Sequence, residues 1–293
     1  MLTREEKIKI VELYNSGLSS LKIAKIINCS KISVLSNLEK SGVKRRPLSE
    51  AKRKYFFNQN YFEKIDTEAK AYFLGLLCAD GCNSEERGTV QIGLQENDKE
   101  ILDKFKNEIN WNGNFYFINK KKKNPKFKNL YLIHLSSKKF SSDLANFGCI
   151  SNKTIHLQWP SNLDKKYYTH FIRGYFDGNG YVSKSETILP KINIISTIPF
   201  IESLKKIIQS NIKINILIEK RKHLKNHSML IINGRNQLLQ FLDWIYTDAS
   251  FFLKRKFERY YGLKFRKTDN RGRKYFNNQL TIKSNKNYGL NTI

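Results

Sequence analysis

Two short segments of this chain repeat one pattern of small and apolar residues. Residues 73–81 read FLGLLCADG, and residues 172–180 read IRGYFDGNG. Gly75 precedes Ala79 by four positions, and Gly174 precedes Gly178 in the same way, so each pair lies on one face of a helix. A glycine inside a helix destabilises it by about 1 kcal/mol relative to alanine. We therefore infer that the small residues serve close packing of the two helices against each other.

The end of each segment carries a residue suited to binding a cation. Asp80 lies at a helix C-terminus, where the helix dipole disfavours a carboxylate. A bound divalent cation, Mg²⁺ or Mn²⁺, would favour it, because hard cations take oxygen ligands. The equivalent position in the second segment, 179 − 80 = 99 residues later, is Asn179. Asp177 is no substitute, because two residues on a helix are separated by about 200° around the axis.

The elements after each segment also repeat, by hydrophobic periodicity and turn signals. The predicted first set is a helix capped by Asp66 and ending at Gly81, a strand at 89–95, a helix at 98–109, strands at 115–119 and 130–135, and a helix at 137–147. The predicted second set is a helix ending at Gly180, a strand at 191–196, a helix at 198–210, strands at 212–219 and 229–232, and helices at 236–246 and 251–260. This order predicts an internal duplication.

The first 46 residues have a different pattern, with three short helices predicted near 5–14, 21–27 and 30–38. Helix, short turn and helix is the arrangement of a helix-turn-helix, and this segment resembles the DNA-binding module of resolvases and invertases. The resemblance implies that Lys31, Ser33 and Asn37 face DNA. A small helical domain with a solvated polar face is the alternative. Arg45 begins a basic linker that could follow phosphates.

The charge of the chain predicts a polyanionic partner. Fifty-three Lys and Arg against 26 Asp and Glu give a net charge of +27 over 293 residues. Such an excess favours nucleic acid through phosphate neutralisation and counterion release. We find no apolar run of the roughly 18 residues that a spanning helix needs, and no signal-peptide pattern. The four cysteines lack zinc-binding spacing. We therefore expect an intracellular protein without a membrane partner.

Taken together, the repeated motif, the repeated element order and the basic charge resemble a single-chain LAGLIDADG homing endonuclease. The resemblance implies an α+β fold in which two αββαββα halves form a pseudo-twofold saddle. It implies a monomer that acts on double-stranded DNA in intron homing. The expected division of the chain is a helix-turn-helix at 1–46, a basic linker at 47–60, halves at 61–162 and 163–264, and a basic tail at 265–293.

The resemblance also implies roles for individual residues. Asp80 and Asn179 would share the metal, while Lys153 and Lys256 would assist at the scissile phosphates, with Lys254 as the rival of Lys256. Strand side chains would contact bases in the major groove, and the charged hairpin tips would contact phosphates. The expected base contacts are Thr89, Gln91, Gln95, Lys191 and Asn193, and the expected phosphate contacts are Lys121 and Arg221.

Asn179 leaves the activity open, because an amide oxygen can bind a metal but adds no negative charge. Cleavage of both strands at a weakened site, nicking of one strand, and binding without cleavage are all compatible with the sequence. A non-cutting binder could be a DNA-binding regulator or a maturase that binds intron RNA. A recombinase is the third alternative, and no serine or tyrosine nucleophile context favours it.

Overall fold

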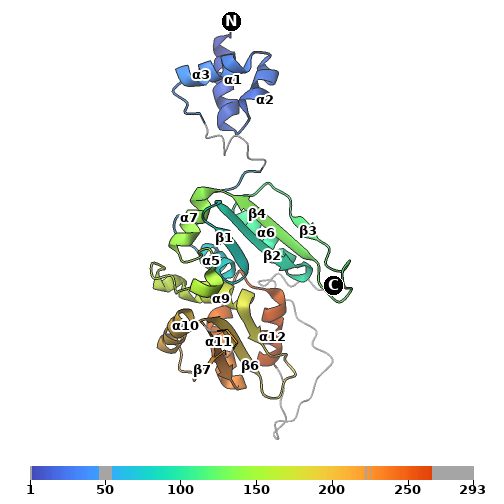
Figure 1. The fold of residues 1–293 in the computed structure, drawn as a ribbon, viewed down its shortest axis with the longest axis vertical. Coiled ribbons are helices and arrows are strands. Elements are labelled where there is room, and N and C mark those ends of the chain that lie inside the picture. The colour runs from blue at the N-terminus through green and yellow to red at the C-terminus, as the bar shows by residue number, and fades with distance from the viewer. Residues whose placement is uncertain (1, 46–54, 222, 225, 266–293) are drawn as a thin grey trace. The chain divides into compact units, whose positions relative to one another are not determined.

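A computed structural model describes residues 2–45, 55–221, 223–224 and 226–265 (Figure 1). The chain divides into two compact units, residues 1–56 and 57–293, which are described separately below. Most of the predicted linker at 47–60 and of the predicted tail at 265–293 lies outside the described residues. Among the residues that are described, no helix has the length and apolar composition needed to cross a bilayer.

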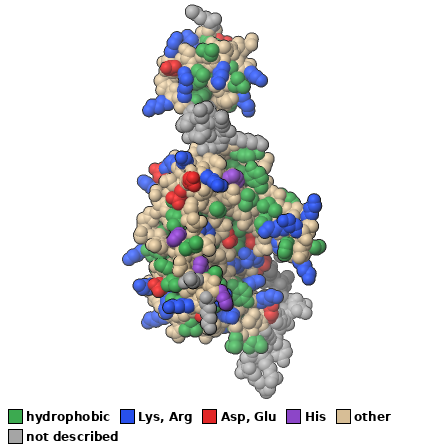
Figure 2. Space-filling model, in the orientation of Figure 1, with side chains coloured by type: hydrophobic (Ala, Val, Ile, Leu, Met, Phe, Trp, Pro, Cys, Tyr) green, Lys and Arg blue, Asp and Glu red, His purple; other side chains and the backbone are tan. Residues whose placement is uncertain are grey.

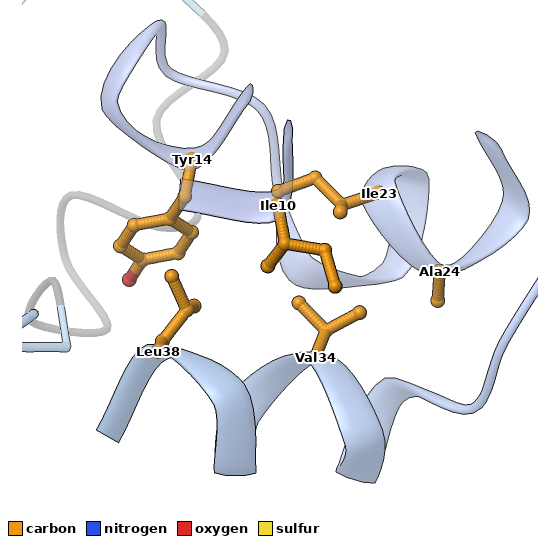
Figure 3. Close-up of a cluster of buried hydrophobic side chains, with 6 residues drawn as sticks. All are labelled: Ile10, Tyr14, Ile23, Ala24, Val34 and Leu38. Carbon is orange, nitrogen blue, oxygen red and sulfur yellow. The ribbon is translucent and has the colours of Figure 1, made fainter. Parts of the chain in front are cut away.

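Residues 2–45 of the N-terminal unit form three helices, as the sequence predicts. They are α1 (Arg4–Asn15), α2 (Ser20–Ile27) and α3 (Lys31–Lys40). The side chains of Ser19 and Ser30 accept backbone N–H groups at the starts of α2 and α3, which satisfies donors that a helix leaves unpaired. All three helices contribute to one small core, shown in Figure 3, which consists of Ile10, Tyr14, Ile23, Ala24, Val34 and Leu38.

The second unit begins its repeat with a long buried helix and a four-stranded antiparallel sheet. The elements of this first half are α5 (Glu68–Asp80), β1 (Gly81–Ser84), β2 (Thr89–Gln95), α6 (Lys99–Glu108), β3 (Tyr116–Ile118), β4 (Leu130–Ser136) and α7 (Lys138–Asn146). The strand order is β1-β2-β4-β3. A short helix, α8 (Lys153–His156), follows and connects to the second half.

The second half repeats this order element by element. Its elements are α9 (Tyr168–Asn179), β5 (Gly180–Val182), β6 (Lys191–Thr197), α10 (Ile198–Asn211), β7 (Leu217–Lys220), β8 (His227–Asn233) and α11 (Arg235–Tyr246), with α12 (Lys254–Lys264) after them. The strand order is β5-β6-β8-β7, which matches the first sheet. The predicted duplicated αββαββα fold is therefore confirmed.

Some elements differ from the predictions, either in where they begin or in not being predicted at all. The N-cap of α5 is Thr67, whose side chain accepts the Lys70 N–H, whereas Asp66 forms an ion pair with the Lys70 side chain at 2.7 Å. Strands β1 and β5 were not predicted, because segments of four and three residues are too short to show an alternating pattern. Two later elements begin further along the chain than predicted: β7 at Leu217 and α12 at Lys254.

Each sheet has one face packed on helices and one face that we call the open face. In β2, Val90, Ile92 and Leu94 are buried on the helix side, while Gln91 and its alternate neighbours lie on the open face. Strand β6 follows the same alternation, with Ile192 and Ile194 buried. Because side chains alternate along a strand, burial of one set fixes the direction of the other.

Candidate active site

The two repeated helices, α5 and α9, pack against each other at the glycines that the sequence singles out (Figure 1). A Cβ added to Gly75 would lie 2.1 Å from the carbonyl oxygen of Phe171 on α9. A Cβ added to Gly174 would lie 1.9 Å from the carbonyl oxygen of Tyr72 on α5. Backbone meets backbone at both positions, so only glycine fits, and the predicted helix interface is present.

The C-terminal ends of the two helices also meet. A Cβ added to Gly178 would lie 2.3 Å from the Cβ of Ala79 and 3.3 Å from the carboxyl carbon of Asp80. The Asp80 carboxylate therefore lies against the residue that precedes Asn179. Both helices end at these positions and continue directly into β1 and β5. The packing brings the two predicted metal-binding residues to one place in the fold.

Asp80 is exposed to solvent on one side and crowded by protein atoms on the other. The crowding raises the pKa of its carboxyl above the usual value, because it disfavours the charged form. The positive charges of Lys256, Lys153 and Arg255 oppose this rise. Asp80 is thus a carboxylate set among three cations that belong to both halves.

Asn179 is also exposed, and its amide is held in place by a chain of hydrogen bonds. The amide nitrogen donates to the Tyr175 hydroxyl at 3.1 Å, and that hydroxyl donates to the Ser196 hydroxyl at 2.8 Å. In this orientation the amide oxygen is the atom left to face a cation. Asn179 therefore offers one neutral oxygen, whereas Asp80 offers the two oxygens of a charged carboxylate.

A lysine from each half contacts the end of a motif helix. The ammonium group of Lys153, on α8, donates to the carbonyl of Ala79 at 2.7 Å. The ammonium group of Lys256, on α12, donates to the carbonyls of Phe176 and Gly180. Lys254 is exposed, so the geometry favours Lys256 over its rival. Lysines near a helix C-terminus also complement the negative end of the helix dipole.

The two lysines differ in their surroundings. Lys153 is half-buried, whereas Lys256 is only 2% exposed. Burial lowers the pKa of Lys256 to about 8, and the negative charge of Asp177 limits the fall. A lysine with such a pKa can exist in both protonation states near neutral pH.

The oxygen donors at the helix ends fit a hard divalent cation. Mg²⁺ commonly binds through one or two carboxylates and completes its shell with water and substrate phosphates. Asp80 and Asn179 provide that kind of partial shell. Across the described parts of the chain, no cluster of three or more His, Cys, Asp or Glu forms a complete metal cage. A cation here would therefore depend on additional ligands from a substrate.

The expected base-contacting residues lie on the open faces of the sheets. Thr89 and Gln91 share that face of β2, and Lys191 and Asn193 share the corresponding face of β6. Gln95 also lies there, but its amide nitrogen donates to the Asp98 carboxylate at 3.0 Å.

The expected phosphate-contacting residues lie near the hairpin tips. Lys121 pairs with Glu96 at 2.6 Å. Arg221 is exposed just after β7. A phosphate at the first tip would therefore compete with Glu96 for its lysine.

The N-terminal unit corrects one expectation. Asn37 is 7% exposed, and its amide donates to the carbonyl of Lys7 at 3.0 Å, so it links α3 to α1 instead of facing DNA. The amphipathic period of α3 places Asn37 beside Leu38 on the buried side. Lys31 is exposed and Ser33 half-exposed, while Arg45 pairs with Glu39 at 3.2 Å.

Two buried charged residues on α9, Arg173 and Asp177, were not predicted from the sequence. Arg173 is 1% exposed and donates to the carbonyls of Phe251 and Ile245, each at 2.7 Å, and to the Glu68 carboxylate at 2.5 Å. Asp177, fully buried, accepts hydrogen bonds from Tyr72, Tyr246 and the backbone of Leu253. Two charged residues four positions apart in an otherwise apolar motif were the signal that could have identified them.

Comparison with known proteins finds a family match for part of this chain. Residues 166–246 match the sequence profile of the LAGLIDADG-like domain family. An uncharacterized protein of Methanocaldococcus jannaschii is 26% identical over 238 residues, which cover 64% of this chain and 87% of that protein.

Two solved structures are also similar. The N-terminal LAGLIDADG domain of DUF199/WhiA has a TM-score of 0.43 and 17% identity, covering 73% of this chain and 97% of that one. The I-LtrWI LAGLIDADG homing endonuclease, bound to target DNA, has a TM-score of 0.42 and 13% identity, covering 70% and 89%.

Proposed function

We propose that the protein is a metal-dependent, site-specific DNA endonuclease whose two strand-cleaving positions are unequal. The observation that carries this proposal is the meeting of the two motif helix ends. It places the Asp80 carboxylate against Gly178, with Lys153 and Lys256 on the adjoining carbonyls. A carboxylate and two flanking lysines suit hydrolysis of a phosphodiester, because they combine oxygen ligands with positive charge.

Each group would have a distinct part in the chemistry. Asp80 and the Asn179 oxygen would hold Mg²⁺ or Mn²⁺, which would supply Lewis-acid assistance and a more acidic water. Lys153 and Lys256 would place positive charge near the scissile phosphates and offset the charge that develops there. Because the lysines come from different halves, each would serve one DNA strand.

The open faces of the sheets support a role in holding the duplex. Strand side chains with hydrogen-bonding groups can read base edges in the major groove, and the chain's charge of +27 favours phosphate contacts. Thr89 and Gln91 in one sheet and Lys191 and Asn193 in the other are the proposed base contacts. Lys121 and Arg221 are proposed to contact the backbone at the hairpin tips, and Lys31, Ser33 and Arg45 to contact it through the N-terminal unit.

A second function is favoured by one specific observation, the neutral Asn179. Without a second carboxylate, the cation would bind more weakly, and the protein could bind nucleic acid without cutting it. The buried state of Lys256 supports the same alternative, since its ammonium group is engaged by two carbonyls. A non-cutting protein of this type would act as a DNA-binding regulator or a maturase on intron RNA.

Plasmid cleavage separates the two functions. Supercoiled plasmids carrying the genomic sequence on either side of the gene would be incubated with protein and Mg²⁺, then resolved into supercoiled, nicked and linear forms. We expect wild-type protein to yield nicked circles before linear product. Asp80→Asn should reduce cleavage about 100-fold, whereas Asn179→Asp should increase the linear fraction.

The matched control is Glu202→Gln, which removes an exposed carboxylate from α10 without touching the helix ends. It should cleave as the wild type does. If wild type and Asn179→Asp both leave the plasmid intact while still retarding it on a gel, the non-cutting alternative is correct. Equal cleavage by wild type and Asp80→Asn would contradict the proposed metal site.

A further inference from the structure

The outer edge of the first sheet carries a row of aromatic rings that the endonuclease proposal does not use. Trp111 and Phe115 have ring centroids 5.9 Å apart, Phe115 and Tyr131 are 6.2 Å apart, and Tyr131 and Phe117 are 5.3 Å apart. We call these four residues the aromatic ladder. It runs from the buried Trp111 to Phe117 on the edge strand β3, where Phe117 is 52% exposed.

The aromatic ladder lies on the helix side of the sheet, not on the open face. Phe117 pairs with Tyr131 across β3 and β4, and Tyr131 pairs with Leu94 across β4 and β2. Leu94 is buried against the helices, and paired residues in neighbouring strands share a face. Lys99, the first residue of α6, lies over the rings of Phe115 and Tyr131 at 4.9 and 5.5 Å. The ladder is therefore separate from the face proposed for the DNA duplex.

A dense group of lysines adjoins the ladder. The hairpin between β3 and β4 contains six lysines in nine residues: Lys120, Lys121, Lys122, Lys123, Lys126 and Lys128. Within the described residues, Lys121 is the one of these six with a carboxylate partner, Glu96. Figure 2 shows blue side chains gathered at the right of the second unit, with green hydrophobic side chains beside them. Exposed aromatic and cationic groups thus share one projecting hairpin.

We propose that this hairpin binds single-stranded nucleic acid. An unpaired base would stack on the exposed ring of Phe117, and the hairpin lysines other than Lys121, which pairs with Glu96, would hold the adjoining phosphates. Proteins that bind single strands combine a basic surface with aromatic rings, because every base has a flat face that can stack. Bases within a duplex stack on one another, so their faces are not available to such a ring. The pairing of rings with lysines therefore fits unpaired nucleotides.

The second half provides an internal contrast. At the equivalent edge, Lys220 of β7 pairs with Ser228 of β8, in the positions that Phe117 and Tyr131 occupy in the first sheet. Neither is aromatic, and Glu219 adds negative charge to the same strand. The two halves share this fold, so the aromatic ladder is not needed to form an edge strand. Ile218, an exposed apolar residue on the same face of β7, supplies a control substitution.

Fluorescence anisotropy with labelled oligonucleotides tests the proposal. The probes would be oligo(U), oligo(dT) and a duplex of mixed sequence, each about 16 nucleotides long, which is the upper range of common single-strand site sizes. Phe117→Leu keeps an apolar side chain but removes the flat ring. We expect it to weaken single-strand binding about 5- to 150-fold, the range for loss of one stacked base. Duplex binding should stay within about twofold. Ile218→Leu should change neither single-strand nor duplex binding, because a surface substitution away from the proposed site has a small effect.

The three oligonucleotides distinguish the possible partners. Tighter binding to oligo(U) than to oligo(dT) would identify RNA as the partner, and the reverse would identify single-stranded DNA. Crosslinking with 5-iodouridine should join the probe to the peptide that contains Phe117. The proposal is overturned if Phe117→Leu binds single strands as the wild type does, or if it weakens duplex and single-strand binding equally.

These measurements do not depend on nuclease activity. Asp80→Asn should bind the single-stranded probes normally, whatever its effect on cleavage. Loss of plasmid cleavage with intact single-strand binding would reject the endonuclease proposal alone. Normal cleavage with unchanged binding by Phe117→Leu would reject the single-strand site alone.

Discussion

The two motif helices pack through the same glycine positions but bury different chemistry beside them. Position 74 on α5 is leucine, and the equivalent position on α9, 74 + 99 = 173, is arginine. Position 78 is cysteine, and its equivalent, 78 + 99 = 177, is aspartate. All four side chains are nearly or fully buried. The backbone geometry of the pair therefore requires the glycines, but it leaves the adjoining positions free to be apolar or charged.

The buried charges of Arg173 and Asp177 on α9 are tolerated because their partners come from both halves. Arg173 reaches Glu68 at the start of α5, and Asp177 accepts the hydroxyl of Tyr72 from the same helix. A buried charge is tolerated when it is paired and hydrogen-bonded. On α5, Cys78 is instead a free thiol that shares a hydrogen bond with the Cys149 thiol. This contact and burial raise the pKa of Cys78. At these two positions the side chains of α9 join the two halves by polar bonds, whereas Cys78 of α5 has its partner within its own half.

The largest expected effect comes from removing the charge on α9. Arg173→Met keeps the volume but leaves Glu68 and two backbone carbonyls without their cation. Breaking a buried ion pair by removing one partner lowers stability by about 3–5 kcal/mol. Urea unfolding followed by circular dichroism would measure the loss. The matched change in the first half, Leu74→Met, conserves volume and should reduce stability by less than about 1.5 kcal/mol. Equal losses of stability in Arg173→Met and Leu74→Met would contradict the proposed difference between the helices.

A smaller effect is expected where the helices are alike. Gly75→Ala and Gly174→Ala should each lower the free energy of unfolding by about 2 kcal/mol or more, because the added Cβ would strike backbone. Gly93→Ala is the control, since its Cβ would meet the end of the Leu132 side chain, which can move. Tolerance of either helix substitution would mean that the helices are not held in backbone contact.

The lysines give a comparison in activity. If the chain cleaves DNA as proposed, Lys153→Met and Lys256→Met should each slow cleavage of a different strand about tenfold or more. End-labelling each strand separately would show which one remains intact. Lys254→Met, a change at an exposed neighbour, should cleave normally. If either variant slowed the cleavage of both strands, the proposal that each lysine serves one DNA strand would be wrong.

The smallest expected effect is a dependence of stability on pH that Lys256 contributes. Its pKa is about 8 in the folded protein and about 10.5 when unfolded, so the unfolded chain binds more protons between these values. Stability should therefore rise as pH increases from about 8 toward 10. Asp177, Asp80 and Asp98 limit the lowering of this pKa, and Arg255 adds to it.

Urea unfolding at pH 7.5 and pH 9.5 would measure this contribution in wild type and in Lys256→Met. Wild type should gain about 1–2 kcal/mol relative to the variant at the higher pH. Lys153→Met serves as the control for removing a lysine from the corresponding place in the first half. A relative loss of wild-type stability at high pH would contradict the assigned direction.

Much of the fold could be predicted because its signals are local. The alternation of Val90, Ile92 and Leu94 identified β2, and glycine spacing identified both motif helices and their interface. The short strands β1 and β5 could not be found, since their pairing partners, rather than their own composition, make them strands. The amide of Asn37 was misplaced for a related reason: its burial depends on where α1 crosses α3.

The sequence by itself determined the duplication, the contact of the motif helices, and Asp80 and Asn179 as the residues at their tips. Periodicity and glycine spacing record such features directly, because each concerns residues a few positions apart. Tertiary structure alone decided that Arg173 and Asp177 are buried charges with partners about 70 to 105 residues away. It also decided that Lys256 is buried and that the aromatic ladder lies on the helix side. These properties depend on which distant groups surround a side chain. A local pattern can mark a residue such as Arg173 as unusual, but it does not specify the partners that the fold brings to it.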